Sequence, residues 1–299
     1  MPHVTVDITH RERVLFPADG ITKGDLVDYY AEVADVMLPH LKGRPLTAQR
    51  FPRGIGEQGF LQQDFANTLP DWLSRAQVAK EGGAVVHPVA DRREALLWLA
   101  NQDCITLHAW LSRQDWPDRP DRLVFDLDPS GREFPAVRAT ARALADVLTG
   151  LGLACYVQTT GSRGLHVVVP LARESDFDTA RQFARGVAGV VAAEDPAHRT
   201  TEIRKSLRGD RVYIDIMRNA YAQTAVAPYA VRARHGAPVA TPLEWDELDE
   251  PGMRADRFSI RDLPKRLAAQ RDPWSEMSSH ARSLSGPRRR LGNGRTDGF

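Results

Sequence analysis

The sequence predicts a mixed α/β or α+β fold with mixed or antiparallel sheets flanked by helices. Two observations lead to this prediction. Segments with apolar residues at helical spacing are interspersed with short apolar-rich segments typical of strands. In addition, two strand-like segments, 154–159 and 165–171, flank the turn Gly161-Ser162-Arg163-Gly164. Strands joined by a short turn run antiparallel, so the pattern favours a mixed sheet over a purely parallel one.

Three segments carry helix signals. The first follows Thr22, a good N-cap residue, and its apolar residues recur at helical spacing, so we expect one helix that Pro39 ends. The second runs from residue 135 to about 151 and ends among glycines. The third runs from residue 177 to about 193. Besides the two hairpin strands, segments 122–128 and 211–217 are short, apolar-rich and read as strands.

Composition limits the class of protein. The 299 residues are 42% hydrophobic, which suits one large globular domain or two small ones. The formal net charge is only +1, so the chain lacks the strong basic excess of many nucleic-acid binders, and charge has to be judged locally. No apolar run is long enough for a membrane span and the first residues do not resemble a signal peptide, so we expect a cytoplasmic protein without membrane partners.

The two cysteines and the C-terminal segment are also informative. Cys104 and Cys155 lie far apart in the sequence, so neither a zinc site nor a disulfide framework is predicted, and both are expected to be buried thiols. Residues 1–277 are expected to form one domain. Residues 278–299, rich in Ser, Gly and Arg, are expected to be a disordered basic tail.

Asp126 and Asp128 are the first candidate functional residues. They lie two apart in a predicted strand, so both carboxylates emerge on the same face. Two anions about 4 Å apart repel by roughly 4 kcal/mol at an effective dielectric near 20, so the pair needs a divalent cation, a shared proton or full solvation. Mg²⁺ and Mn²⁺ favour such oxygen ligands. The alternative is a strand end with solvated aspartates.

The second candidate is the segment Thr159-Thr160-Gly161-Ser162-Arg163-Gly164-Leu165-His166. Its glycines let backbone N–H groups approach an anion, its hydroxyls can donate hydrogen bonds, and its arginine can clamp two oxygens. This composition suits phosphate, although an ordinary hairpin turn with a solvated arginine would have the same pattern. Asp215, on another predicted strand shortly after Arg208, adds a third carboxylate. Three acids and a basic phosphate cradle describe a two-metal nucleotidyl-transfer site.

At this point the sequence resembles a known family, the polymerase domain of the bacterial end-joining protein LigD in the archaeo-eukaryotic primase superfamily. The resemblance covers roughly residues 5–275. Its motifs occur in order as Asp126-Leu127-Asp128-Pro129, Gly161-Ser162-Arg163-Gly164-Leu165-His166 and Val212-Tyr213-Ile214-Asp215. Further matches are Arg13-Val14-Leu15-Phe16-Pro17, Gly43-Arg44-Pro45, His108-Ala109-Trp110, and Asn219 followed by Ala227-Pro228-Tyr229.

The resemblance implies a primase-like catalytic core and specific residue roles. Asp126 and Asp128 would hold two divalent ions, Mn²⁺ or Mg²⁺, and Asp215 would complete the site for the ion that activates the primer 3′-hydroxyl. The incoming nucleoside triphosphate would be bound by Thr160, Ser162, Arg163, His166 and Arg208, with His108 beside its sugar or base. On the DNA, Arg13 and Lys23 would grip the 5′-phosphate across a gap, while Arg50, Arg53 and Phe60 would face the template.

Four positions depart from the family pattern. Leu61 occupies a position where many relatives have a second phenylalanine, and Gln49, Gln63 and Gln223 replace basic residues. Base stacking on an aromatic ring is worth about 1–3 kcal/mol, and each lost phosphate contact lowers the salt dependence of binding. We therefore expect weaker DNA binding than in these relatives, with the catalytic acids retained.

The sequence also lacks the K-x-D-G tetrapeptide of DNA ligases, so we expect a nucleotidyltransferase of the polymerase or primase type that is not itself a ligase. Its expected role is template-dependent addition of nucleotides, preferably ribonucleotides, to gapped or broken DNA in repair or non-homologous end joining. Expected partners are a separate ligase and a Ku-type end-binding protein at the nucleoid. Two alternatives stay open: a DNA-end or gap-binding module with vestigial polymerase activity, and a metal-dependent phosphohydrolase.

Overall fold

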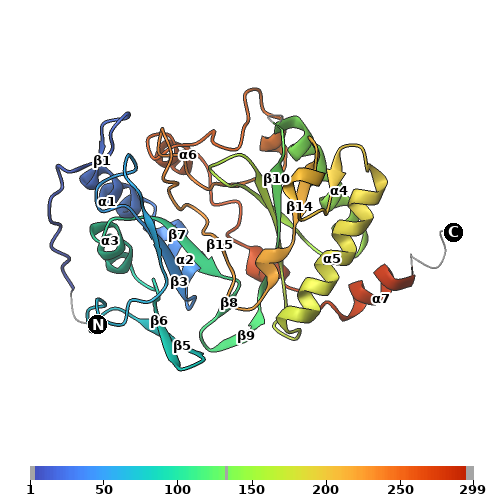
Figure 1. Ribbon diagram of the computed structural model, residues 1–299, viewed down its shortest axis with the longest axis horizontal. Helices are drawn as coiled ribbons and strands as arrows, with labels where there is room; N and C mark the ends of the chain where they lie inside the picture. The colour runs from blue at the N-terminus through green and yellow to red at the C-terminus, as the bar shows by residue number, and fades with distance from the viewer. Residues whose placement is uncertain (1–3, 132–133, 294–299) are drawn as a thin grey trace. The chain divides into compact units, whose positions relative to one another are not determined.

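The computed structural model describes residues 4–131 and 134–293, which divide into two compact units (Figure 1). Unit 1 comprises Met1–Asp115, Thr224–Thr241 and Asp256–Asp272, and unit 2 comprises Trp116–Gln223, Pro242–Ala255 and Pro273–Phe299. The chain passes back and forth between the two units, so neither unit is a continuous stretch of sequence. One domain over residues 1–277 stays a prediction.

A six-stranded sheet forms the centre of unit 2. Its strand order is β13 (Arg199–Thr200), β14 (Val212–Asp215), β10 (Arg122–Pro129), β12 (Leu165–Pro170), β11 (Tyr156–Thr159) and β16 (Pro242–Leu243). All neighbours are antiparallel except β13 and β14, which are parallel. The predicted mixed sheet and the predicted hairpin of β11 and β12 are therefore confirmed.

Two long helices cover this sheet. Helix α4 (Phe134–Gly150) and helix α5 (Phe177–Glu194) contact each other and both contact β10, so they lie on the same face of the sheet (Figure 1). Helix α5 begins after Asp176, whose carboxylate accepts a hydrogen bond from the backbone N–H of Thr179. The unit also contains β9 (Trp116–Pro120) and the 3₁₀ turns η1 (Lys205–Leu207), η2 (Met217–Asn219), η3 (Asp246–Asp249) and η4 (Met277–His280).

Unit 1 contains a four-stranded antiparallel sheet in the order β15 (Thr224–Val226), β7 (Cys104–Trp110), β3 (Leu46–Arg50) and β4 (Phe60–Gln62). Two further pairs are β1 (Val14–Phe16) with β2 (Ile21–Thr22), and β5 (Arg75–Lys80) with β6 (Gly83–Pro88). Helices α1 (Lys23–Glu32) and α2 (Ala34–Leu41) contact α3 (Arg93–Asn101), which packs on β7. Strand β8 (Ser112–Arg113) and helix α6 (Leu263–Ala269) complete the unit.

The first predicted helix is two helices in the structure. Thr22 caps α1 as expected, and with Asp25 it forms a capping box. The helix ends at Glu32, however, and Pro39 lies inside α2, so the expectation of one helix that Pro39 ends is wrong. The chain turns at Val33, where φ is −90° and ψ is 2°, and the backbone N–H groups of Val36 and Met37 both turn back to its carbonyl. The break is thus set by a local turn rather than by the proline.

The C-terminal segment is ordered over more residues than the sequence suggests. Residues 278–299 are expected to be disordered, yet η4 and helix α7 (Ser285–Asn293) occupy much of this segment. Leu284 is buried, and a Cβ atom at Gly186 of α5 would lie 2.8 Å from the Leu291 side chain. Close packing of a leucine against a glycine therefore holds α7 on α5. Residues 294–299 lie outside the described residues.

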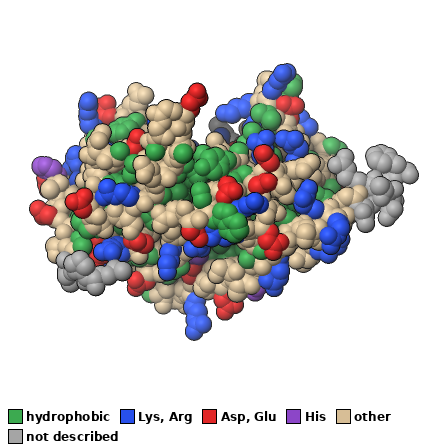
Figure 2. All heavy atoms as spheres, turned by 90° about the horizontal axis from the view of Figure 1, so that it is seen from below, with side chains coloured by type: hydrophobic (Ala, Val, Ile, Leu, Met, Phe, Trp, Pro, Cys, Tyr) green, Lys and Arg blue, Asp and Glu red, His purple; other side chains and the backbone are tan. Residues whose placement is uncertain are grey.

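Charged side chains of both signs are interspersed over the face shown in Figure 2, in keeping with the net charge of +1. Of the two cysteines, Cys104 is buried, as predicted, and Cys155 is half-buried. None of the helices in the described part of the chain combines the length and the hydropathy that a bilayer crossing needs.

Candidate metal centre and nucleotide site

Three carboxylates meet on the six-stranded sheet of unit 2. Asp126 lies directly opposite Asp215 in the antiparallel register of β10 and β14, and Asp128 lies two residues further along β10. One carboxylate oxygen from each residue falls within 4.8 Å of the other two. The residues between and before the two acids of β10, Leu127 and Phe125, are fully buried on the opposite face of the strand. The predicted acid triad is thus brought together by strand alternation and register.

Asp126 is the most enclosed of the three acids, with 8% of its surface exposed. Its Oδ1 lies 3.4 Å from His166 Nε2 on the neighbouring strand β12, and its Oδ2 lies 3.5 Å from Arg218 Nε. Burial by itself would raise the pKa of Asp126, but His166 and Arg218 outweigh burial and hold that pKa below its ordinary value. Asp126 is therefore kept as a carboxylate.

The other two acids are partly exposed. Burial raises the pKa of Asp128, and the nearby charges of Asp126 and Asp215 raise it further. Asp215 accepts a hydrogen bond of 2.7 Å from the backbone N–H of Met217 and one of 3.4 Å from the Tyr213 hydroxyl, both at Oδ1. The triad thus contains one carboxylate that two neighbouring basic side chains, His166 and Arg218, keep ionised and one whose ionisation its neighbours oppose.

The predicted phosphate turn connects β11 to β12 and is closed by Thr160. The Thr160 hydroxyl donates to the carbonyl of Gly164 and accepts from the Gly164 N–H, at 3.0 and 3.2 Å. A Cβ atom at Gly164 would lie 2.0 Å from the carbonyl oxygen of Leu127, so only glycine fits there. The turn therefore lies tightly against the strand that carries Asp126 and Asp128.

The side chains at the tip of this turn are the ones available to a ligand. Ser162 is half-buried, and Arg163 is exposed. Arg163 makes no hydrogen bond or ion pair with any residue that the structure describes. His166, by contrast, is 3% exposed, and its Nδ1 lies 3.1 Å from Gln158 Nε2. An amide nitrogen can only donate, so Nδ1 accepts and Nε2 carries the proton toward Asp126.

Arg208 lies in the loop after η1. Its Nε donates to the carbonyl of Glu202 and an Nη donates to that of Ile203, at 2.9 and 2.7 Å. The guanidinium carbon lies 3.6 Å from the centre of the Tyr213 ring. Since the Tyr213 hydroxyl bonds to Asp215, the arginine is connected through this ring to the acid triad.

The remaining predicted site residues belong to unit 1. His108 lies on β7 between Thr47 of β3 and Val226 of β15. Arg50 ends β3, stacks on the Phe60 ring at 5.5 Å and donates to Gln62 Oε1 at 2.7 Å. Arg53 is exposed in the loop that follows, and Phe60 is 48% exposed. Arg13 and Lys23 lie together around one aspartate, described below.

Three residues of the site escaped the sequence analysis. Arg218 contacts Asp126, Tyr213 joins Arg208 to Asp215, and Gln158 contacts His166. Two of them could have been found from strand geometry. Tyr213 is two residues from Asp215 and so shares its face of the strand, and Gln158 lies directly opposite His166 in the hairpin. Arg218 lies within the 3₁₀ turn η2, and no spacing rule predicts the direction in which a side chain of such a turn points.

The acid triad fits a divalent metal of the hard, oxygen-preferring kind. Its ligands are carboxylates from two adjacent strands, all within reach of one ion or a close pair of ions. Arg163, which makes no hydrogen bond or ion pair with a described residue, and the glycines beside it lie in the turn between β11 and β12, where they can meet a phosphate. An antiparallel sheet with such acids and such a turn defines a metal-dependent nucleotidyltransferase as the class of protein.

The comparisons identify the family. Residues 22–274 match the model of the LigD primase-polymerase domain, and the chain belongs to this family. The multifunctional non-homologous end joining DNA repair protein LigD of Mycobacterium tuberculosis is 37% identical over 285 residues, which are 92% of this chain and 37% of that protein. The Pseudomonas aeruginosa multifunctional non-homologous end joining protein LigD is 32% identical over 298 residues, 97% of this chain and 35% of that protein.

A solved structure supports the same family assignment. The polymerase domain of Mycobacterium tuberculosis ligase D in complex with DNA superimposes with a TM-score of 0.87 at 37% identity, covering 93% of this chain and 99% of that one. The predicted resemblance, fold and enzyme class are confirmed by these matches. The chain spans little more than a third of the length of these two LigD proteins.

Proposed function

We propose that the chain is a template-dependent primase-polymerase that adds nucleotides, with ribonucleotides preferred, to gapped or broken DNA in non-homologous end joining or repair. The observation that carries this proposal is the convergence of Asp126, Asp128 and Asp215 beside the glycine turn of β11 and β12. The DNA in the related polymerase-domain structure supports DNA as the substrate. A DNA substrate also supports the expected location at the nucleoid.

The acids would hold two divalent ions, Mn²⁺ or Mg²⁺, with Asp126 and Asp128 contacting both and Asp215 contacting one. When bound, such ions neutralise phosphate charge and lower the pKa of the primer 3′-hydroxyl. The 3′-oxygen attacks the α-phosphorus of the incoming nucleotide, a new phosphodiester bond forms, and the bond to pyrophosphate breaks. His166 and Arg218 keep Asp126 ionised, which leaves this acid ready to hold a cation.

The triphosphate would be bound by the turn and by Arg208. Arg163 is available for a bidentate contact, and Ser162 lies beside it on the turn. Thr160 acts by shaping the turn, because its hydroxyl is already bonded to Gly164. His166 and Arg208 border the acids from either side of β10 and β14, and His108 would contact the sugar or base.

DNA would be held by unit 1. Arg13 and Lys23 would bind the 5′-phosphate at the far side of a gap, and Arg50, Arg53 and Phe60 would face the template. Phe60 is exposed and stacked on Arg50, so its ring is oriented for a base. A separate ligase would seal the product, and a Ku-type protein would hold the ends.

A second candidate function is a DNA-end or gap-binding module with weak polymerase activity. Leu61, next to Phe60, is 57% exposed and offers a base no aromatic surface. Weak template binding would make extension slow even with a complete acid triad. This candidate predicts that binding to a 5′-phosphorylated gap persists while extension stays undetectable in Mn²⁺.

Primer extension distinguishes the two. The substrate is a short gap with a 5′-phosphate, supplied with Mn²⁺ and either ribo- or deoxyribonucleoside triphosphates. The proposal predicts addition of the templated nucleotide, faster with ribonucleotides, and no addition by the Asp126→Ala, Asp128→Ala double variant. Equal extension by that variant would exclude the acid triad as the catalytic centre. Labelled DNA that is degraded rather than extended would favour a phosphohydrolase.

A further inference from the structure

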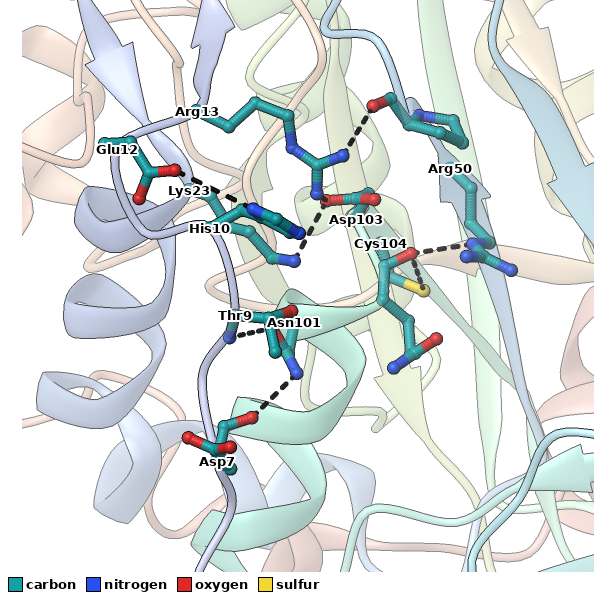
Figure 3. A network of polar contacts seen from close by, with 12 residues as sticks. Asp7, Thr9, His10, Glu12, Arg13, Lys23, Arg50, Asn101, Asp103 and Cys104 are labelled. Carbon is teal, nitrogen blue, oxygen red and sulfur yellow. Dashed lines mark hydrogen bonds and ion pairs between the residues drawn. The ribbon is translucent and has the colours of Figure 1, made fainter.

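Asp103 is a buried acid at the centre of a cluster of basic residues in unit 1 (Figure 3). It lies in the turn between α3 and β7 and is 6% exposed. Its φ angle is 61°, a left-handed conformation that few residues other than glycine, asparagine and aspartate adopt. Two hydrogen bonds fix the backbone of Asp103: its N–H donates to the carbonyl of Ala100, and its carbonyl accepts from the N–H of Phe51.

A single oxygen of Asp103 contacts two cations. Oδ1 lies 2.7 Å from an Nη of Arg13 and 3.5 Å from Nζ of Lys23. Lys23 is almost completely buried, with 1% of its surface exposed. Arg13 keeps a third of its side chain exposed, and its other Nη donates to the carbonyl of Pro52. The aspartate therefore holds one exposed and one buried cation side by side.

The cluster has more positive than negative charge. Arg50 approaches from β3, where its Nε donates to the carbonyl of Gln102, the residue before Asp103. Burial lowers the pKa of Lys23, and the charges of Arg13 and Arg50 lower it further, while Asp103 is the group that opposes them. Three cations around one carboxylate leave a net charge that suits a doubly charged terminal phosphate.

We propose that Asp103 is a positioning residue for recognition of a terminal 5′-phosphate: it aims the exposed Arg13 guanidinium and holds the buried Lys23 ammonium beside it, so that the two positive charges together attract the phosphate. This role rests on the proposed function, which gives Arg13 and Lys23 that phosphate. The left-handed backbone at Asp103 supports this role. Asparagine or glycine would satisfy a φ of 61° equally well, so what aspartate adds at this position is its negative charge.

The test compares two gapped DNAs that differ only in a 5′-phosphate or a 5′-hydroxyl at the far side of the gap. The ratio of their dissociation constants, measured by fluorescence anisotropy between pH 6.5 and 9, gives the phosphate discrimination of each variant. Asp103→Asn and Asp103→Gly both tolerate the backbone conformation, so either one carries the test. The matched control is Asp28→Asn, which removes an exposed carboxylate of α1 that pairs with Arg11.

The proposal predicts that Asp103→Asn and Asp103→Gly lose about tenfold in phosphate discrimination at pH 8, roughly the worth of one hydrogen bond to a charged group. As pH rises, their remaining discrimination disappears at a lower pH than in the wild type, because Lys23 loses its proton earlier. Asp28→Asn keeps the wild-type ratio. In a Lys23→Gln background, removal of Asp103 has a smaller effect, because only its contact with Arg13 is then lost.

Three results would overturn the role of Asp103. They are a wild-type ratio and pH profile in Asp103→Asn, an equal loss with and without Lys23, or no discrimination between the two DNAs by the wild type. The polymerase proposal is decided separately, by template-directed extension on the gap that ends in a 5′-hydroxyl, which needs no phosphate contact.

Discussion

Asp126 and Asp215 lie directly opposite one another on neighbouring antiparallel strands, so two carboxylates from distant parts of the chain project from one face of the sheet. Like charges at opposing positions destabilise a sheet, and Asp128 adds a third acid nearby. His166 and Arg218 compensate Asp126, the most buried of the three. A bound cation would relieve the repulsion that remains.

Removing one of the three negative charges should raise the thermal stability of the metal-free protein. In the metal-free protein, Asp128→Asn is expected to raise Tm by about 2–4 °C, the shift that ~1 kcal/mol produces in a domain of this size class. The raised pKa of Asp128 has the matching sign: an acid whose pKa rises on folding makes the native state less stable once it is ionised. Differential scanning fluorimetry in EDTA tests this.

The control for this comparison is Asp146→Asn, an exposed aspartate of α4 that should leave Tm unchanged. Adding Mn²⁺ should reverse the order, because the ion stabilises the wild-type protein more than Asp128→Asn. A metal-free Asp128→Asn protein that melts below the wild type would show that the acids do not repel each other in the folded state.

Gly164 should tolerate no side chain. A Cβ atom there would collide with the carbonyl oxygen of Leu127, so Gly164→Ala should force β12 away from β10 and cost about 1–3 kcal/mol or more. Gly189→Ala on α5, where a Cβ meets nothing within 4 Å, should instead stabilise by about 0.5–1 kcal/mol. Urea unfolding of both variants checks this contrast, and similar midpoints would refute the close approach.

Asn219 acts as an extra partner for strand β10. Its amide exchanges two hydrogen bonds with the backbone of Val124, of 2.8 and 2.7 Å, and it is 2% exposed. Asn219→Ala should cost at least about 2 kcal/mol, because each buried backbone group left unpaired costs ~1–3 kcal/mol. Asn101→Ala, at a half-buried asparagine that bonds to Asp7 and Thr9 near the N-terminus, is the comparison and should cost less. Equal losses for both in thermal unfolding would mean that the Val124 backbone finds another partner.

Template binding should improve when an aromatic ring is added beside Phe60. Leu61→Phe is expected to tighten binding to gapped DNA by up to about 1–3 kcal/mol of stacking, with the salt dependence unchanged because no charge is added. Anisotropy titrations over a salt series give both quantities. Unchanged affinity, or a wild-type salt slope as steep as that of a lysine-rich relative, would remove the reason to expect weak DNA binding.

Much of the candidate site could be predicted from the sequence, because it is built on regular strands. Asp126 and Asp128 share a face by alternation alone, and the turn that ends at Gly164 has strong glycine signals. The break at Val33 and the position of Arg218 could not be predicted, since both depend on irregular backbone turns. Asp103 escaped for another reason: its partners Arg13 and Lys23 are distant in sequence, and only the folded chain brings them together.

The most direct test of the nucleotidyl-transfer centre is single-turnover extension by Asp215→Asn at saturating Mn²⁺, gapped DNA and nucleoside triphosphate. Asp215 is the ligand assigned to the ion beside the primer 3′-hydroxyl, so its loss should slow the chemical step at least about 100-fold, within the range expected for removing one group that stabilises transition-state charge. Binding of the nucleotide, which the proposal assigns to Arg163 and Arg208, should change little. Extension at the wild-type rate by Asp215→Asn would contradict the proposed mechanism.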